Sequence, residues 1–273
     1  MELIEILKVV VLGIVEGITE WLPISSTGHM LLVDEFIHMN VSDSFKDMFF
    51  VVIQLGAILA VVMLFWNKMW PFQTKDKSKP VIRKDVFSMW FKVVVACIPG
   101  AIVTLLFDDY IEAHLHTPTV IALALVVYGV AFIVIENWNK KRTPKVLALE
   151  DISYKTAFII GLFQVLSIIP GTSRSGSTII GALTIGVSRV AAAEFTFFLA
   201  VPVMIGLSFI KILKFGLSFT SVELMTLAIG CVVAFLVSVL VIKFLMSYIK
   251  KRDFKIFGWY RIVLGVILLL YFM

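Results

Sequence analysis

Charged side chains are scarce in this chain: aspartate, glutamate, lysine and arginine make up 16% of its 273 residues, whereas hydrophobic residues make up 60%. A soluble domain carries charge on about a quarter of its residues, so this composition excludes an ordinary soluble fold. The balance predicts an integral membrane protein whose residues 1–273 form one domain.

Cysteine is also nearly absent. Cys97 and Cys231 each lie inside an apolar run, which argues against a disulfide framework and against a cysteine metal site. The first eight residues lack both a basic segment and a small-residue cleavage site, so we expect them to belong to the mature protein. The net charge of +5 comes from lysines and arginines in short loops between apolar runs, which favours membrane orientation over nucleic-acid binding.

Six apolar runs are long enough to cross a bilayer as helices, because a hydrocarbon core of about 30 Å needs about 20 helical residues. They cover residues 48–66, 86–107, 118–138, 195–213, 222–246 and 256–273. Two further segments, 3–33 and 155–186, are interrupted near residues 23–28 and 170–177 by proline, glycine, serine and threonine. Irregular backbone at membrane depth is tolerated only where it is buried in protein or lines a wet cavity.

Lysine and arginine are distributed unevenly among the loops. Loops 67–85, 139–155 and 247–255 are strongly basic, whereas loop 108–117 has neither residue. The positive-inside rule places the three basic loops in the cytoplasm. The last two basic loops can share that side only if segment 155–186 enters and leaves the membrane by the same face. This segment is therefore predicted to form a re-entrant hairpin.

The two interrupted segments share a pattern. In each segment a glycine and, three residues later, a glutamate or glutamine precede a proline and a run of hydroxyl residues. These pairs are Gly13 and Glu16 in the first segment and Gly161 and Gln164 in the second. Three spans follow each segment, and because three is odd the second unit must be inverted relative to the first. We therefore predict an all-α polytopic membrane protein with six transmembrane helices and two re-entrant hairpins. Its inverted repeats would cover about 1–140 and 151–273, with a site at the midplane and both termini outside.

The first interruption carries most of the ionisable groups. Glu16 and Glu20 lie four residues apart on one helical face, where two carboxylates could share a proton or bind a divalent cation. Ser26 is a useful nucleophile if a base lies within hydrogen-bonding reach, and His29, Glu20 or both could be that base. Further candidate phosphate-binding residues are Ser25, Thr27 and Gly28. Helix capping is the competing explanation for the hydroxyls, and the choice between Ser25 and Ser26 stays open.

The second interruption has the residues of an anion site. Arg174 would be costly at membrane depth without an anion to meet. Exposed N–H groups at a helix start, together with a guanidinium, form a cradle for phosphate. The other candidate phosphate-binding residues here are Ser173, Ser175, Gly176 and Thr178.

The two motifs resemble the signatures of the bacterial undecaprenyl-diphosphatase family, also called bacitracin resistance proteins. They read Glu16-Gly-Ile-Thr-Glu-Trp-Leu-Pro-Ile-Ser-Ser-Thr-Gly-His29 and Pro170-Gly-Thr-Ser-Arg-Ser-Gly-Ser-Thr178. Residues 52–61 and 188–195 extend the resemblance, and the length and the order of spans agree with it. The resemblance therefore covers nearly the whole chain.

The resemblance implies an enzyme of the bacterial cell membrane, with its site open to the outer face. Its substrate would be undecaprenyl diphosphate, the carrier lipid left after cell-wall assembly, from which the terminal phosphate is removed. It implies Ser26 as the nucleophile, with Glu16, Glu20 and His29 as acid–base and cation-binding partners, and Arg174 as the phosphate clamp.

The resulting expectations are a phosphoserine intermediate at Ser26 and a Mg²⁺ or Ca²⁺ ion on Glu16 and Glu20. A polyprenyl diphosphate, membrane lipid and a second copy of the chain are the expected partners, and nucleic acid is not. The main alternative is a lipid-phosphate transporter or flippase, because paired re-entrant hairpins recur in transporters. A purely structural membrane protein would leave the charges at membrane depth unexplained.

Overall fold

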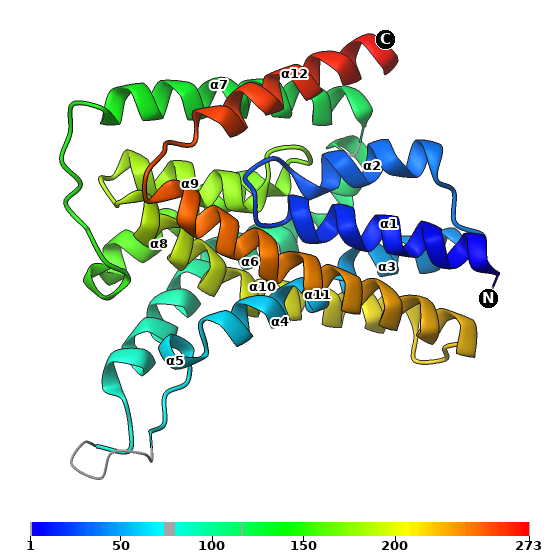
Figure 1. The fold of residues 1–273 in the computed structure, drawn as a ribbon, viewed down its shortest axis with the longest axis horizontal. Helices are drawn as coiled ribbons and strands as arrows, with labels where there is room; N and C mark the ends of the chain where they lie inside the picture. The colour runs from blue at the N-terminus through cyan, green and yellow to red at the C-terminus, as the bar shows by residue number, and fades with distance from the viewer. Residues whose placement is uncertain (1, 74–79, 116, 273) are drawn as a thin grey trace.

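The computed structural model describes residues 2–73, 80–115 and 117–272, and almost all of its regular structure is helical (Figure 1). The helices of the first half are α1 (Leu3–Thr19), α2 (Ser26–Phe36), α3 (Asp43–Val52), α4 (Gln54–Leu64), α5 (Trp66–Met69), α6 (Lys84–Leu115) and α7 (Pro118–Asn139). Those of the second half are η1 (Leu149–Asp151), α8 (Tyr154–Val165), η2 (Leu166–Ile168), α9 (Arg174–Thr184), α10 (Arg189–Phe215), α11 (Ser221–Ile249) and α12 (Lys255–Phe272). The described residues contain two isolated β-bridges and no β-strand.

Six helical segments are long and apolar enough to cross a membrane, which confirms the predicted number of spans. They are Asp43–Leu64, Lys84–Phe107, Pro118–Asn139, Arg189–Phe215, Ser221–Ile249 and Lys255–Phe272. The protein is therefore an all-helical, multi-pass membrane protein.

The prediction of a loop at 108–117 was wrong, because α6 continues to Leu115. No proline or glycine lies between Ala101 and Leu115, so nothing in the sequence ends the helix there. The next helix begins directly afterwards, at Pro118, with the Thr117 hydroxyl accepting a hydrogen bond from the backbone N–H of Val120.

The two interrupted segments are each a pair of short helices, α1 with α2 and α8 with α9. Both second helices begin earlier than predicted, at Ser26 and Arg174. The first break therefore lies at 20–25, earlier than 23–28, and the second lies at 169–173, which is shorter than 170–177. The reason is local: Ser25 and Ser173 each accept a hydrogen bond from the N–H of the glycine three residues later and so cap the helix.

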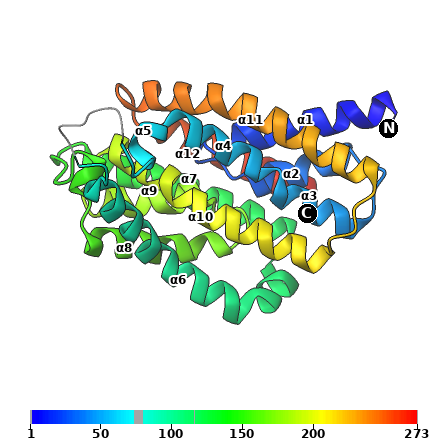
Figure 2. The same ribbon diagram turned by 90° about the horizontal axis from the view of Figure 1, so that it is seen from below.

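Helix α10 is the enclosed centre of the molecule, running between α11 on one side and α6 on the other in Figure 2. Every residue from Ala191 to Val201 is buried, and the helix packs against α3, α4, α6 and α9. The outer helices present apolar side chains such as Leu240 of α11 and Leu270 of α12. Exposed leucine at these positions suits a surface that faces lipid.

The breaks of the two helix pairs meet inside the molecule. In Figure 1, α1 and α2 approach from the N-terminal end, whereas α8 and α9 approach from the opposite end. Arg261 of α12 is fully buried between the breaks and donates hydrogen bonds to the carbonyl oxygens of Pro23, Gly171 and Thr172, at 3.2, 2.8 and 2.9 Å. One guanidinium thereby joins the two segments that carry the sequence motifs.

Candidate active site

The two helix starts at the site have the same unusual backbone. Ser25 and Ser173, with φ of 75° and 72°, are the two non-glycine residues with positive φ in the described part of the chain. Their hydroxyls accept from the N–H groups of Gly28 and Gly176 at 3.3 and 3.1 Å. A backbone of this kind costs about 1–3 kcal/mol and persists only where the surroundings enforce it. Both breaks are therefore built to hold a defined shape.

Glu20 connects the nucleophile candidate to the arginine. Its Oε2 accepts a hydrogen bond from Ser26 Oγ at 2.8 Å, and its Oε1 accepts one from Arg174 Nη2 at 2.9 Å. The Glu20 backbone carbonyl also accepts from Ser175 Oγ at 3.2 Å. The structure thus brings together three residues from two distant motifs, as the sequence predicted.

Arg174 keeps part of its hydrogen-bonding capacity free. Nη1 donates to the backbone carbonyl of Thr196 at 3.1 Å, whereas the buried Nε has no partner among the described residues. A buried N–H without an acceptor is costly. An anion placed beside Ser26 would supply that acceptor.

Glu16 is buried one helical turn before Glu20, and its Oε1 has no hydrogen-bond partner within the described structure. No cluster of three histidine, cysteine, aspartate or glutamate side chains occurs among the residues described. The chain can therefore offer a divalent cation two carboxylates. Mg²⁺ is commonly held by one or two carboxylates, with phosphate oxygens and water completing its shell, so the donor set fits such an ion.

His29 lies apart from this group. Its Nδ1 is 2.7 Å from the Ser25 carbonyl oxygen, and its Nε2 is 2.6 Å from the Tyr260 hydroxyl. A carbonyl can only accept, so Nδ1 donates, and Nε2 of the neutral ring accepts from Tyr260. No hydrogen bond in the described structure joins His29 to Ser26. The geometry consequently favours Glu20 over His29 as the base for Ser26.

The remaining predicted residues divide between cavity wall and support. Thr27 and Ser173 line the cavity described below. Thr178 is buried, with its hydroxyl donating to the Arg174 carbonyl at 3.0 Å and lying 2.9 Å from the Thr196 hydroxyl. The others support the helix starts from buried positions: Ser25, Gly28, Ser175 and Gly176.

Three residues that contact the candidate site are only weakly indicated by the sequence. Arg261 could be recognised only as an ionisable residue within an apolar span, and its neighbour Tyr260 resembles an ordinary interfacial aromatic residue. Thr196 lies within an apolar run and binds Arg174 through its backbone, so its side-chain type carries no signal. Only their tertiary positions reveal them.

Ser26, Glu20 and Arg174 stand at the polar end of a cavity of about 470 Å³. The other end is lined by apolar side chains of α6 and α10, among them Leu105, Met204, Leu207 and Ile210. Such a cavity suits an amphipathic molecule whose polar group reaches the serine and whose apolar part lies between the two helices.

Comparison with known proteins agrees with the motifs. Residues 9–267 match the family model described as bacitracin resistance protein BacA. The chain belongs to this family. An undecaprenyl-diphosphatase of Enterococcus faecalis is 74% identical over 270 residues, covering 99% of this chain and 98% of the relative. Undecaprenyl-diphosphatases of Desulfitobacterium hafniense and Lachnoclostridium phytofermentans are each 62% identical over 273 residues, with 98% and 99% of the relative covered.

The family assignment bears out the resemblance seen in the two motifs. The match extends from within α1 to within α12, so it includes both breaks and every residue of the Ser26–Glu20–Arg174 group. The family members thus share the full length of the fold rather than one local motif.

Proposed function

We propose that this chain hydrolyses undecaprenyl diphosphate to undecaprenyl phosphate and inorganic phosphate, and so regenerates a lipid carrier of cell-wall synthesis in the bacterial cell membrane. The observation that carries the proposal is the hydrogen-bonded group of Ser26, Glu20 and Arg174 in a cavity whose lining is mostly apolar. The relatives named undecaprenyl-diphosphatase support the same substrate.

The proposed reaction has two steps. Ser26 Oγ attacks the terminal phosphorus, the bond from that phosphorus to the bridging oxygen breaks, and Glu20 takes the serine proton. Glu20 then passes this proton to the departing lipid phosphate. In the second step water attacks the phosphoserine and gives a proton to Glu20, the bond between Ser26 Oγ and phosphorus breaks, and Glu20 returns the proton to Ser26 as inorganic phosphate leaves. Arg174 stabilises the charge on the transferred group, since phosphoryl transfer depends mainly on positioning and electrostatics.

A divalent cation held by Glu16 and Glu20 would neutralise charge on the diphosphate. The unpaired Glu16 Oε1 supports this placement. His29 acts in this proposal as a positioning residue, because it holds the Ser25 carbonyl and Tyr260 rather than the nucleophile.

Removal of the cation is expected to abolish phosphate release, and Mg²⁺ or Ca²⁺ is expected to restore it. Glu16→Gln should raise the cation concentration needed for half-maximal activity by about tenfold or more, because a ligand oxygen loses its charge. The control is Glu35→Gln, which changes an exposed carboxylate on α2. Titrations of both variants in chelator-treated protein decide the question; activity that survives chelation would contradict the cation site.

Several further features of the proposal concern the membrane. The α1–α2 and α8–α9 pairs would form re-entrant hairpins of inverted repeats over about 1–140 and 151–273. Matching caps at Ser25 and Ser173 support this, as does reciprocal packing, with α1 against α11 and α8 against α6. The basic loops favour a cytoplasmic side opposite both termini. A cavity open to the outer face, which the family resemblance implies, and a homodimeric assembly are further parts of the proposal.

Phosphate labelling tests the proposed function. Purified protein would receive undecaprenyl diphosphate carrying radioactive phosphorus in its terminal phosphate, followed by acid quenching and peptide mapping. We expect label on Ser26 together with release of free phosphate. Release with label on another residue would remove the proposed nucleophile. Neither label nor release from folded protein would favour the alternative function of lipid-phosphate transport.

Filling the apolar end of the cavity is expected to impair use of the long-chain substrate. Gly206 of α10 lines this end, and a Cβ added there meets no atom within 4 Å. Gly206→Leu should lower kcat/KM for undecaprenyl diphosphate by about tenfold or more, because its side chain occupies space proposed for the prenyl chain. Gly206→Ala is the size control. An equal loss with farnesyl diphosphate would show that the tail does not follow this path.

A further inference from the structure

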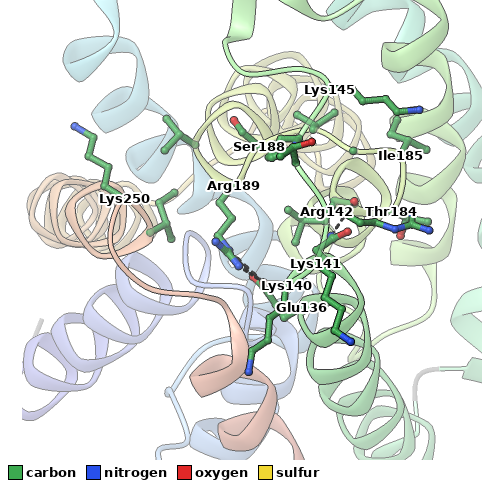
Figure 3. Close-up of a pocket in the computed structure, with 18 residues that line it drawn as sticks. Glu136, Lys140, Lys141, Arg142, Lys145, Thr184, Ile185, Ser188, Arg189 and Lys250 are labelled. Carbon is green, nitrogen blue, oxygen red and sulfur yellow. Dashed lines mark hydrogen bonds and ion pairs between the residues drawn. The ribbon is translucent and has the colours of Figure 1, made fainter.

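A second cavity, of about 1040 Å³, lies at the other end of α9 from Arg174 (Figure 3). Its walls come from the end of α7, the following residues 140–145, the turn between α9 and α10, and the end of α11. Thr184, which lines this cavity, is the last residue of α9, and Arg174 is its first. The cavity and the candidate active site are therefore about 15 Å apart along one helix. The proposed reaction uses none of its residues.

The cavity is strongly basic. Six cationic side chains and one carboxylate line it: Lys140, Lys141, Arg142, Lys145, Arg189, Lys250 and Glu136. The carboxylate is already engaged, because Glu136 Oε1 accepts from Arg189 Nε at 2.8 Å and from the Phe254 N–H at 3.0 Å. Figure 3 shows Arg189 directed at this buried glutamate. Asp253 lies near Lys140 and pairs with Lys255 at 3.3 Å, but it does not line the cavity. Positive charge is therefore in excess among the residues that line it.

Two kinds of contact fix the basic loop after α7. The Arg142 guanidinium lies 3.5 Å from the centre of the Trp138 ring. The backbone N–H groups of Lys145 and Ser188 donate to Gly186 and Val146, both at 2.8 Å, which fixes the basic loop against the turn between α9 and α10. No carboxylate pairs with Lys141, Arg142, Lys145 or Lys250 in the described part of the chain.

Neighbouring charges repel each other at the edge of the cavity. The ammonium of Lys255 lowers the pKa of Lys140 below its ordinary value. The basic residues line a cavity whose walls also include Thr184 and Ser188.

The cavity walls also contain apolar groups. Leu183, Ile185, Val187, Val190 and Ile249 line it between the cations. Three of the helices that end or begin here, α7, α10 and α11, are candidate membrane spans, which places the cavity where helices leave the bilayer. The exposed Trp138 side chain beside it is typical of that interface. A cavity of this size and mixed lining suits an amphipathic anion better than a small ion.

We propose that this basic cavity binds the phosphate-bearing headgroup of an anionic phospholipid. The phosphate contacts the lysines and Arg142, and the glycerol backbone with the start of the acyl chains lies against the apolar wall. Basic pockets at the ends of membrane helices favour such headgroups. Free inorganic phosphate shares the chemistry of the headgroup and is the alternative that the experiment separates.

Binding of short-chain phosphatidylglycerol to the purified full-length protein in detergent, measured by native mass spectrometry, tests the proposal. Lys141→Gln combined with Lys145→Gln should weaken binding roughly thirty-fold. Each lysine near a lipid phosphate strengthens binding by a factor of about five, and the two factors multiply. The control combines Lys155→Gln with Lys251→Gln, which removes the same charge from exposed positions outside the cavity.

We expect the control to bind like the wild type, and phosphatidylcholine to bind much more weakly than phosphatidylglycerol. Inorganic phosphate should not displace the lipid at comparable concentration. Displacement by phosphate would assign the cavity to the free ion and overturn the lipid proposal. Equal losses in the two double variants would show a diffuse charge effect and overturn it as well. Circular dichroism of both variants confirms that each remains folded.

Discussion

Replacing Ser26 with alanine is expected to lower phosphate release from undecaprenyl diphosphate by at least about 10³-fold. The Ser26 hydroxyl lines the cavity and donates to Glu20 at 2.8 Å, so it is the hydroxyl placed to attack with a base already engaged. Without it the phosphoserine cannot form. Initial rates with purified variants, together with labelling at Ser26 in the wild type, measure the effect.

Ser25→Gly is the matched control for this prediction. The Ser25 hydroxyl is buried and caps α2 through the Gly28 N–H, so it serves the helix and not the substrate. Glycine tolerates the positive φ at this position and replaces a serine cap at a cost of about 0.3 kcal/mol. We expect this variant to keep most of its activity. If it were inactive while Ser26→Ala retained activity, the two serines would exchange roles.

The residues of the candidate site could be identified from the sequence because polar side chains at membrane depth are costly. Glu20, Ser26 and Arg174 are polar groups in segments that otherwise read as apolar, and helical spacing placed Glu16 and Glu20 on one face. If the two breaks are expected to meet, Glu20 and Arg174 are expected to lie close together. The roles proposed for them come from the resemblance of the two motifs to the family signatures.

Helix starts and partners were harder to predict. Glycine, serine and proline marked both breaks, but the same serines cap helices, so the residues after Ser25 and Ser173 are helical rather than irregular. His29 is a candidate base for Ser26 from its closeness in sequence and from the family resemblance, whereas its Nε2 lies beside the hydroxyl of Tyr260, which is 231 residues away in the chain. A contact of that kind depends on tertiary packing, and nothing in the local pattern indicates it.

Arg174 should show the second large effect, because it acts on two groups at once. It pairs with Glu20 through Nη2 and keeps a buried Nε without an acceptor, so its planar fork can hold the base and the phosphate together. Arg174→Gln is expected to lower kcat/KM by about 10³-fold, since an arginine that stabilises a transferring phosphoryl group contributes on that order. Lysine at this position keeps the charge but offers a single point of contact.

Arg174→Lys therefore separates charge from geometry. We expect it to recover only a small part of the activity lost in Arg174→Gln, because an ammonium cannot bind Glu20 and the phosphate in the bidentate manner of a guanidinium. Added guanidinium ions should partly rescue an Arg174→Ala variant, which a purely structural role for the residue would not allow. Full activity in Arg174→Lys would show that only the positive charge of Arg174 matters. Unchanged activity in Arg174→Gln would show that Arg174 takes no part in the reaction and that its bond to Glu20 only links the two breaks.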